Sequence, residues 1–252
     1  MEPIILYDAP SQRSYKAWSP NTWKIRYALN YKGIAYRTEW TEYPDIEPLC
    51  KRLGIPPTDK KPNGGDRYTL PIIYDPSTNT AVGDSAKIAK YLDTAYPRTP
   101  RIFPPGTDAF QAAFEAFFLS KILQPTFRTV AAQTAAKTLN PISGEFFRRS
   151  REEDFYFGKL ENLNTPEAWK ALEEGLGQAK IFLEANGEGK ALTFFGNKDK
   201  LTFSDFQLAA VLKWSKSAWG DNSEEWERIA RFHDGFPGKF LEQFNELEVV
   251  DL

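Results

Sequence analysis

The chain has 252 residues, of which 41% are hydrophobic and 26% charged, enough for one large domain or two modest ones with separate cores. A formal net charge of -2 gives no field that would gather nucleic acid or an anionic membrane surface. With one cysteine, Cys50, and one histidine, His233, the chain has neither an internal disulfide nor a Cys/His metal cluster.

The start of the chain favours a protein that is not exported. The sequence begins Met-Glu-Pro and reaches a strand-like run at once, so it lacks the basic segment and apolar region of a signal peptide. No apolar run approaches the roughly 20 residues that span a bilayer. We therefore expect a soluble protein of the cytoplasm.

The first hundred residues alternate strand-like and helix-like patterns, as a βαβ unit followed by a ββα unit would. The predicted strands cover residues 3–8, 34–40, 70–75 and 80–84, and the predicted helices cover residues 20–32, 44–53 and 84–97. This order predicts an α/β domain over residues 1–97.

Four prolines between residues 97 and 105 end any helix and stiffen the chain, so we place a linker at residues 98–106. Beyond it the periodicity is helical, which predicts an all-α domain over residues 107–252. The predicted helices cover residues 107–137, 144–160, 165–186, 202–217, 223–232 and 237–247. Thr202 and Asp205 have capping-box spacing before an apolar helix, with Leu201 and Phe206 as a hydrophobic staple, and we interpret this as a structural cap.

Ser19 and Pro20 stand where the first predicted helix begins. A strand, a loop, a helix that starts with a nucleophile-type residue and a later strand entered through Leu70-Pro71 make the thioredoxin arrangement. Ser19 to Thr22 occupy the place of Cys-x-x-Cys, so disulfide chemistry is lost. A helix N-terminus that favours an anion remains.

The combination of "TLPIIYD", "VGDSAKIAKYLD", the proline-rich linker and the helical half resembles a cytosolic glutathione transferase over nearly the whole chain. "WSPNTWKIRYALNYKGI" resembles the serine-type members, especially the fungal-specific class A and the related bacterial β-etherases. The resemblance implies a thioredoxin-like N-terminal domain, an all-α C-terminal domain and glutathione as co-substrate, without a metal.

The resemblance also implies residue roles. Ser19 aligns with the serine that donates a hydrogen bond to the glutathione sulfur, and both its hydroxyl and the helix N-terminus favour a thiolate. Asn21 is either a second donor to the sulfur or a first-turn residue that satisfies the backbone. Pro71 matches a cis-proline that lets Leu70 pair with the cysteinyl backbone of glutathione.

At the γ-glutamyl end of glutathione, the resemblance assigns Ser85 to the carboxylate and Asp84 to the ammonium, although the family usually has the longer Glu or Gln before this serine. The cation for the glycyl carboxylate stays open among Lys51, Arg52, Lys60 and Lys61. We interpret three other cations, Lys24, Arg26 and Lys32, as a solvated helix face and not as ligands.

Residues 56–71 are long for the connection before the cis-proline strand, and Asn63-Gly64-Gly65 is a strong turn signal. Class A members have an extra hairpin here that closes over glutathione and obstructs the usual dimer surface. We expect such a hairpin near residues 57–69, with Tyr68 or a lysine such as Lys60 near the ligand, and a monomer or an unconventional dimer. The alternative is a disordered loop.

The aromatic residues predicted around the site for the electrophile, the second substrate, suit a planar hydrophobic or aromatic compound. Phe110, Phe114, Phe117 and Phe118 follow helical spacing and favour a core stripe, but in this family the same helix lines the electrophile site. The resemblance therefore offers Phe114 and Phe118 for one wall of that site, and Tyr15 and Trp18 for the other.

Two functions remain open. One is conjugation of glutathione to a hydrophobic electrophile, with etherase or peroxidase activity as variants, and the other is a ligandin that stores aromatic compounds. Gly83-Asp84-Ser85 does not indicate a serine hydrolase, because His233 has no convincing partner as a base. His233 is interpreted as structural or at the surface, and Cys50 as lying away from the Ser19 loop.

Overall fold

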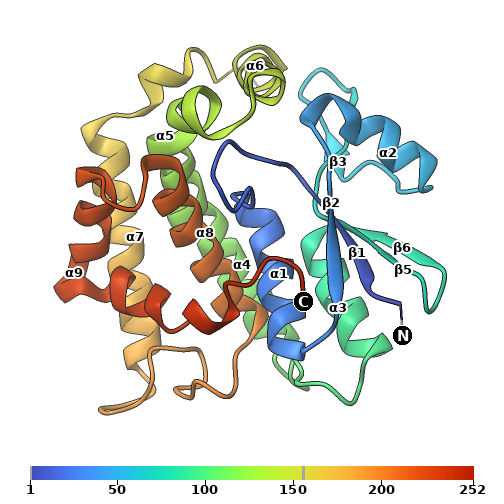
Figure 1. The fold of residues 1–252 in the computed structure, drawn as a ribbon. Helices are drawn as coiled ribbons and strands as arrows, with labels where there is room; N and C mark the ends of the chain where they lie inside the picture. The colour runs from blue at the N-terminus through green and yellow to red at the C-terminus, as the bar shows by residue number, and fades with distance from the viewer. Residues whose placement is uncertain (1, 155–156) are drawn as a thin grey trace.

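A computed structural model describes residues 2–154 and 157–252 of the chain. The first part forms a four-stranded mixed sheet in the order β2-β1-β5-β6. Its strands are β1 (Ile4–Asp8), β2 (Tyr36–Trp40), β5 (Ile72–Asp75) and β6 (Thr80–Gly83). β1 pairs in parallel with β2, and the other two pairings are antiparallel. This is the predicted sheet with slightly shorter strands, and it lies on one side of the molecule (Figure 1).

The helices of this part are α1 (Pro20–Lys32), α2 (Ile46–Arg52) and α3 (Ser85–Ala95), with the 3-10 turn η1 (Tyr43–Asp45) before α2. Ser19 is the N-cap of α1, and Gly33 ends the helix with a φ of 63°, the left-handed conformation that glycine adopts at no steric cost. α1 packs against α3 and against α8 (Phe203–Trp219) of the second half. The thioredoxin-like fold is confirmed, and α1 lies between the sheet and the helical half (Figure 1).

A two-stranded antiparallel hairpin precedes the cis-proline strand. β3 (Asp59–Lys60) pairs with β4 (Asp66–Arg67) across the Asn63-Gly64-Gly65 turn. Gly64 has a φ of 86°, and the Asn63 Oδ1 accepts a hydrogen bond of 3.0 Å from the backbone N–H of Gly65. The side-chain amide and the glycine together close the turn, as this residue pattern predicts.

The second half is helical, and the predicted all-α domain is confirmed. Its other α-helices are α4 (Asp108–Phe118), α5 (Gln124–Gln133), α6 (Pro141–Arg149), α7 (Pro166–Glu184) and α9 (Glu224–Glu242). The π-helical turns η2 (Leu119–Leu123), η3 (Thr134–Thr138) and η4 (Ser150–Asp154) follow α4, α5 and α6. The described residues of this half also form the 3-10 turns η5 (Leu160–Leu163) and η6 (Asn245–Leu247).

Two helix predictions in this half need correction. The helix predicted over 144–160 begins at Pro141 instead, because proline suits the first helical position, and its described part continues through η4 to Asp154. Residues 155–156 of that prediction lie outside the described residues. The break predicted between the helices over 223–232 and 237–247 is present, because residues 232–235 have non-helical backbone angles, but the second helix ends at Glu242 instead of residue 247.

Pro125 bends the long helical run from Asp108 to Thr138. Proline has no N–H, so it cannot donate to the carbonyl of Lys121 one turn earlier, and the π-helical turn η2 ends two residues before it, at Leu123. The freed Lys121 carbonyl lies against Gly175 of α7, where an added Cβ would approach its oxygen to 2.0 Å. The bend places Leu119 and Leu123 of η2 at the cavity described below.

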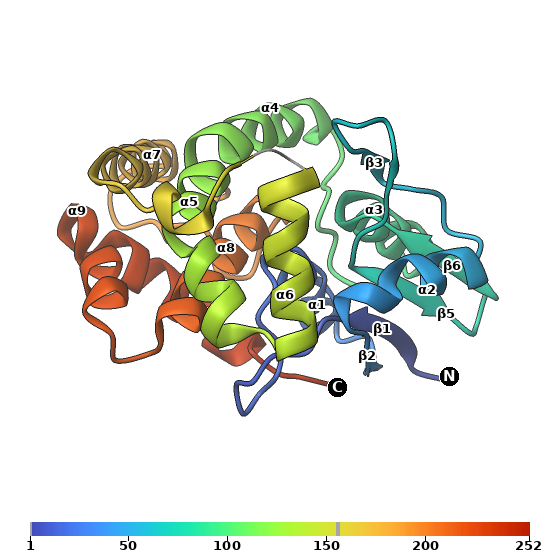
Figure 2. The ribbon, with the colours of Figure 1, turned by 90° about the horizontal axis from the view of Figure 1, so that it is seen from above.

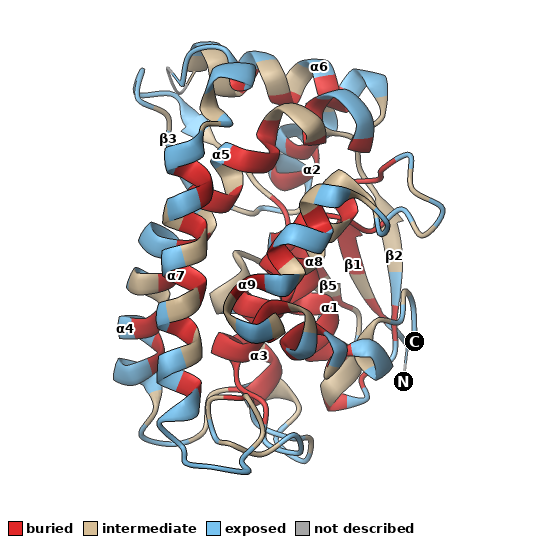
Figure 3. Cartoon of the chain, turned by 90° about the vertical axis from the view of Figure 1, so that its left-hand side faces the viewer, coloured by how far each residue is buried: buried red, intermediate tan, exposed pale blue. Residues whose placement is uncertain are grey.

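α8 is the buried centre of the helical half. The predicted capping box is confirmed: the Asp205 Oδ2 accepts from the Thr202 backbone N–H at 2.7 Å, and the Thr202 Oγ1 accepts from the Asp205 N–H at 3.4 Å. Leu201 and Phe206 are both buried. Buried positions gather where α1, α8 and the sheet meet (Figure 3).

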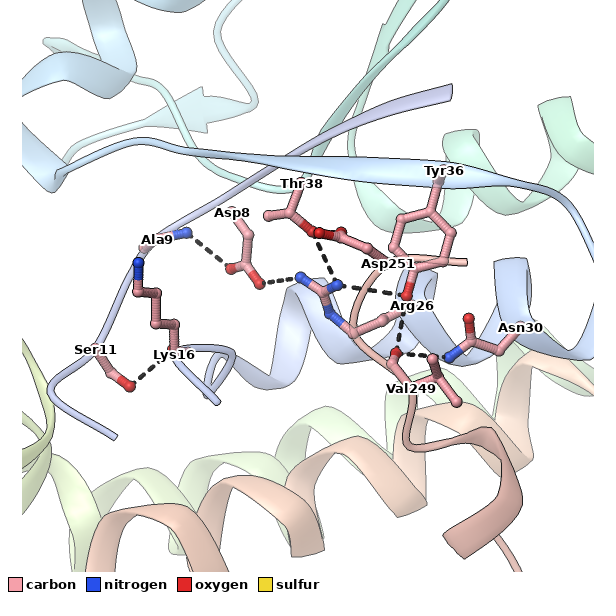
Figure 4. Close-up of polar contacts among 10 residues, drawn as sticks. All are labelled: Asp8, Ala9, Ser11, Lys16, Arg26, Asn30, Tyr36, Thr38, Val249 and Asp251. Atoms are coloured by element: carbon pink, nitrogen blue, oxygen red, sulfur yellow. Dashed lines mark hydrogen bonds and ion pairs between the residues drawn. The ribbon is translucent and has the colours of Figure 1, made fainter. Parts of the chain in front are cut away.

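The solvated cationic face predicted for α1 is wrong, because Lys24, Arg26 and Lys32 are all buried. Arg26 forms an ion pair of 2.9 Å with Asp8 of β1 (Figure 4), and Lys32 forms one of 2.6 Å with Asp93 of α3. Neighbouring elements cover α1 on the sides that carry these cations, so two of the positive charges are compensated by carboxylates instead of water.

The segment after η6 crosses back to the edge of the sheet. The backbone N–H groups of Tyr36 and Leu252 each donate to the other residue's carbonyl at 3.1 Å. The Asn30 side chain and the Tyr36 hydroxyl both donate to the Val249 carbonyl at 2.9 Å (Figure 4). This tail covers the edge strand β2. None of the helices in the described ranges is long and apolar enough to cross a membrane.

Candidate active site

Ser19 lies at the point where two cavities meet. It has an extended backbone, with φ -67° and ψ 127°, and its hydroxyl makes no capping hydrogen bond within the described part of the chain. The hydroxyl is therefore available to a ligand beside the free N–H groups of the first turn of α1. Only 9% of the residue is exposed, so such a hydrogen bond would form in a largely dehydrated place.

The larger cavity, which we call the aromatic cavity, has a volume of about 280 Å³ and is lined mainly by rings and leucines. Its apolar wall includes Trp18, Leu123, Phe127, Phe147, Phe157 and Trp214. The ring centroids of Trp18 and Trp214 are 6.5 Å apart, and those of Phe127 and Phe157 are 5.3 Å apart. Rings at these distances pack against one another, so they form a continuous aromatic wall, which suits a planar aromatic guest.

The smaller cavity, which we call the polar cavity, has a volume of about 150 Å³ and lies between the hairpin, α2 and η4. Its polar lining includes Glu47, Lys61, Asp66, Arg67, Tyr68 and Asp154. Lys61 of the hairpin forms an ion pair of 2.8 Å with Asp154 of η4, so the hairpin is tied to the helical half across this cavity.

Five residues line both cavities: Ser19, Asn21, Tyr43, Arg67 and Arg151. The two cavities are therefore parts of one cleft, with Ser19 at their junction. α6 forms one side of the cleft and lies next to the start of α2 (Figure 2). The ring centroid of Tyr43 lies 6.1 Å from that of Phe146 and 5.8 Å from that of Phe147, which fixes this contact.

Lys24 determines how Asn21 faces the cleft. The buried Lys24 ammonium lies 5.5 Å from the Phe118 ring centroid and donates a 3.0 Å hydrogen bond to the Asn21 Oδ1. An ammonium can only donate, so the amide oxygen must face it and the amide NH₂ is free to donate elsewhere. Burial lowers the pKa of Lys24 to about 8, which leaves it mostly charged at neutral pH.

The cis Leu70-Pro71 bond that the sequence predicts is confirmed. β5 and β6 pair with Ile72 opposite Gly83, and continuing this register places Leu70 and Pro71 beside Asp84 and Ser85. Asp84 is the N-cap of α3, and its Oδ1 accepts from the Lys87 N–H at 3.0 Å. Ser85 is the first residue of α3, so a second helix N-terminus lies near the same end of the sheet.

The chain matches family models described as the glutathione S-transferase N-terminal domain over residues 18–95 and the C-terminal domain over residues 109–247. It is 35% identical over 235 residues to the glutathione S-transferase-like protein ustS of Aspergillus flavus, covering 87% of this chain and 81% of that protein. The chain belongs to the glutathione S-transferase family.

Solved structures of fungal glutathione transferases are similar to this transferase over almost the whole chain. GSTFuA3 from Phanerochaete chrysosporium is 49% identical with a TM-score of 0.95, covering 100% of both chains. CsGST63524 from Ceriporiopsis subvermispora is 44% identical with a TM-score of 0.92, covering 99% of both chains, and its structure is a complex with glutathione. The resemblance to fungal transferases is thereby confirmed.

The structure brings some of the predicted glutathione residues into one place. Ser19, Asn21, Tyr68 and Leu70 line the polar cavity. Pro71, Asp84 and Ser85 do not line it, although the strand register places them at its end of the sheet. Among the four cations left open, Lys61 lines the cavity, whereas Lys60 pairs with Asp66 and Lys51 pairs with Glu47 at 2.7 Å.

On the electrophile side, Trp18 lines the aromatic cavity but the other three predicted residues do not. Phe114 and Phe118 are buried in the core, because their helix face packs inward, where Phe114 lies 4.4 Å from Phe194 between ring centroids. The Tyr15 hydroxyl forms a 3.0 Å hydrogen bond with the Ser217 hydroxyl of α8. Phe114 and Phe118 therefore belong to the core stripe that their helical spacing favours.

Another part of the same predicted helical run lines the aromatic cavity. The part of the long helical run that lines the aromatic cavity carries Leu119, Leu123 and Phe127 at i, i+4 and i+8, followed by Arg128. This spacing is visible in the sequence. Tyr43, Phe147 and Arg151 reach the cavity only because α6 docks beside η1, and no local pattern predicts that.

Cys50 and His233 take no part in the cleft. Cys50 is buried in α2, where burial raises the pKa of its thiol to about 11, and it lines neither cavity. The His233 Nε2 lies 2.7 Å from the Glu173 carbonyl, and an added Cβ on Gly177 would meet the His233 ring at 2.6 Å. His233 therefore has a structural role at the kink in α9.

Proposed function

We propose that this transferase activates the glutathione thiol through Ser19 and transfers the sulfur to hydrophobic, aromatic electrophiles. The observation that carries the proposal is the position of Ser19, on the border of a polar cavity and an aromatic cavity. A sulfur atom beside this hydroxyl would have the peptide on one side and the electrophile on the other. The complex of CsGST63524 with glutathione supports the choice of thiol.

The chemistry requires a thiolate at neutral pH. A cysteine thiol has a pKa of about 8.5, and lowering it by two units corresponds to about 2.7 kcal/mol of differential stabilisation. The Ser19 hydroxyl and the first turn of α1 would both favour the anion. The Asn21 amide, whose oxygen is held by Lys24, would offer a further N–H donor. The thiolate then attacks the electrophilic carbon, and the leaving group departs with its electron pair.

The direct test is conjugation of glutathione to 1-chloro-2,4-dinitrobenzene by the purified chain, followed by absorbance of the thioether. The alternative functions are a ligandin for aromatic compounds, favoured by the ring-lined cavity, and a glutathione-dependent β-etherase or peroxidase. Tight binding of aromatic compounds without turnover would favour the ligandin. Cleavage of a β-aryl ether or reduction of a hydroperoxide would favour the other variants.

Ser85→Ala should weaken glutathione binding by about 1–3 kcal/mol, because the γ-glutamyl carboxylate would lose a charge-assisted hydrogen bond. Isothermal titration calorimetry measures the difference. Thr94→Ala is the matched control, because Thr94 is exposed on the same helix and its hydroxyl donates to the Lys90 carbonyl of that helix. If both substitutions weaken glutathione binding equally, or if neither weakens it, Ser85 is not part of the glutathione site.

We also propose that the hairpin of β3 and β4 closes over glutathione, with Tyr68 near the peptide. The Lys61–Asp154 ion pair is the contact that would hold it closed. We expect glutathione to increase the hydrogen-exchange protection of residues 57–69, measured by mass spectrometry. Lys61→Met should reduce that gain. Equal exchange with and without glutathione would contradict the closure.

We propose a thioredoxin-like domain over residues 1–97, a linker over 98–106 and a helical domain over 107–252, in a cytoplasmic enzyme. We propose a monomer or an unconventional homodimer, because the hairpin adds bulk beside the cleft. Analytical ultracentrifugation measures the oligomeric state.

A further inference from the structure

The two parts of the cleft differ in charge. Three arginines, Arg67, Arg128 and Arg151, line the aromatic cavity, and no Asp or Glu among the described residues does. The polar cavity is balanced, because its lining contains three carboxylates and three cations: Glu47, Asp66, Asp154, Lys61, Arg67 and Arg151. Cations therefore outnumber carboxylates in the lining of the aromatic cavity, but not in the lining of the polar cavity.

Of the three carboxylates that directly follow Arg151 in sequence, Glu152 and Asp154 have cationic partners and Glu153 is exposed. Asp154 pairs with Lys61 at 2.8 Å, and Glu152 pairs with Arg148 at 3.0 Å. Arg151 itself donates to the Ser150 hydroxyl at 2.7 Å, and its guanidinium carbon lies 4.1 Å from the Phe147 ring centroid. Burial lowers the pKa of Arg151, but a guanidinium stays protonated in a protein.

Arg128 is the arginine that distinguishes the lining of the aromatic cavity from that of the polar cavity. Arg67 and Arg151 line both cavities, so either could hold a carboxylate of glutathione. Arg128 lines the aromatic cavity and not the polar cavity, and it is exposed at the border with a groove beside α7 that Glu167 and Glu174 also line. Arg128 lies one residue beyond Phe127, whose ring is part of the aromatic wall. A guanidinium at this position could reach an anionic group carried by an aromatic guest, and its fork of N–H donors matches a carboxylate.

We propose that the aromatic cavity selects aromatic carboxylates, with the ring among Trp18, Phe127 and Trp214 and the carboxylate held by Arg128 and Arg151. The inference rests on the proposed function, because it names the substrate class of the same site. In the reaction, the glutathione thiolate forms a C–S bond to the ring carbon that carries a halide. The C–halogen bond breaks, halide leaves with the electron pair, the thiol proton goes to solvent, and the carboxylate is unchanged.

The test uses a matched pair of electrophiles, 4-chloro-3-nitrobenzoate and its methyl ester. For each, kcat/KM is divided by the rate constant of the uncatalysed reaction with glutathione, which removes the difference in intrinsic reactivity. Arg128→Gln should lower the carboxylate-to-ester ratio by about three- to tenfold, and Arg128→Gln with Arg151→Gln by more than about tenfold, as expected for losing charge-assisted hydrogen bonds. The loss should be mainly in KM.

Arg149→Gln is the charge-matched control, because Arg149 is exposed on α6 and lines neither cavity. It should leave the ratio unchanged. A ratio that falls equally in the control would show a general effect of net charge and overturn the proposal. So would an unchanged ratio in the double variant.

A binding measurement separates failure of this inference from failure of the proposed function. Calorimetry of the two compounds without glutathione reports selection by the cavity, whether or not the enzyme conjugates them. If neither compound is conjugated but the carboxylate binds more tightly in an Arg128-dependent way, the conjugation proposal fails and the inference stands. If both are conjugated and the ester binds as tightly as the carboxylate, only the inference fails.

Discussion

Ser19→Ala should slow glutathione conjugation by about ten- to a thousandfold, the range for losing one oriented donor to a developing or bound anion. Glutathione affinity should change less, because the rest of the peptide would still be held by the hairpin and the end of the sheet. The pKa of the bound thiol should rise, since the hydroxyl favours only the thiolate. The acid limb of kcat/KM against pH should therefore move to higher pH, and the deficit should shrink in alkaline solution.

Ser19→Thr is the conservative control, since it keeps a hydroxyl at the N-cap and should retain most of the shift in thiol pKa. Asn21→Ala is the companion variant, because the Asn21 amide oxygen is held by Lys24 and its NH₂ would be the next donor. If Ser19→Ala leaves the pH profile unchanged and Asn21→Ala moves it, Asn21 activates the sulfur and the role proposed for Ser19 is wrong.

The features that the sequence predicted well depend on local chemistry. Ser19-Pro20 predicts the start of α1 because proline suits the first helical position, and the helix does begin at Pro20. Thr202 and Asp205 predict their own reciprocal cap. Asn63-Gly64-Gly65 predicts a turn from φ preferences alone, and β3 and β4 pair across it. In each case residues within a few positions of one another determine the structure.

The features that were missed depend on contacts between distant segments. Arg151 and Tyr43 are 108 positions apart, yet both line the same two cavities. The sequence pattern predicts a charged helix surface at Lys24, Arg26 and Lys32, but α1 is covered by the sheet, α3 and α8. Their burial is tolerated because Asp8 and Asp93 lie opposite two of them. Helical periodicity describes one helix and cannot report what covers it.

The buried pair in β1 and α1 gives the largest expected effect on stability. Arg26→Met should destabilise the protein by about 3–5 kcal/mol, because it leaves the fully buried Asp8 carboxylate without its cation. Arg26 also donates to the Thr38 hydroxyl at 3.0 Å, so the substitution removes a link between α1 and β2 (Figure 4). Urea unfolding at pH 7, followed by circular dichroism, measures the change.

The pH dependence of the variant distinguishes a lost charge pair from lost packing. Burial raises the pKa of Asp8 and the Arg26 guanidinium opposes that rise, so in Arg26→Met the folded-state pKa should lie still further above the unfolded value of about 3.9. The folded variant then holds a proton that the unfolded chain has released, and its stability falls as pH rises above about 4. The deficit should therefore be smaller at pH 5 than at pH 7. Arg37→Met, which breaks an exposed ion pair of 2.8 Å with Glu39 on the same sheet edge, should cost at most about 1 kcal/mol at either pH. A loss in Arg26→Met that is equally large at both pH values would mean that packing and hydrogen bonds around Arg26, not compensation of Asp8, account for its contribution.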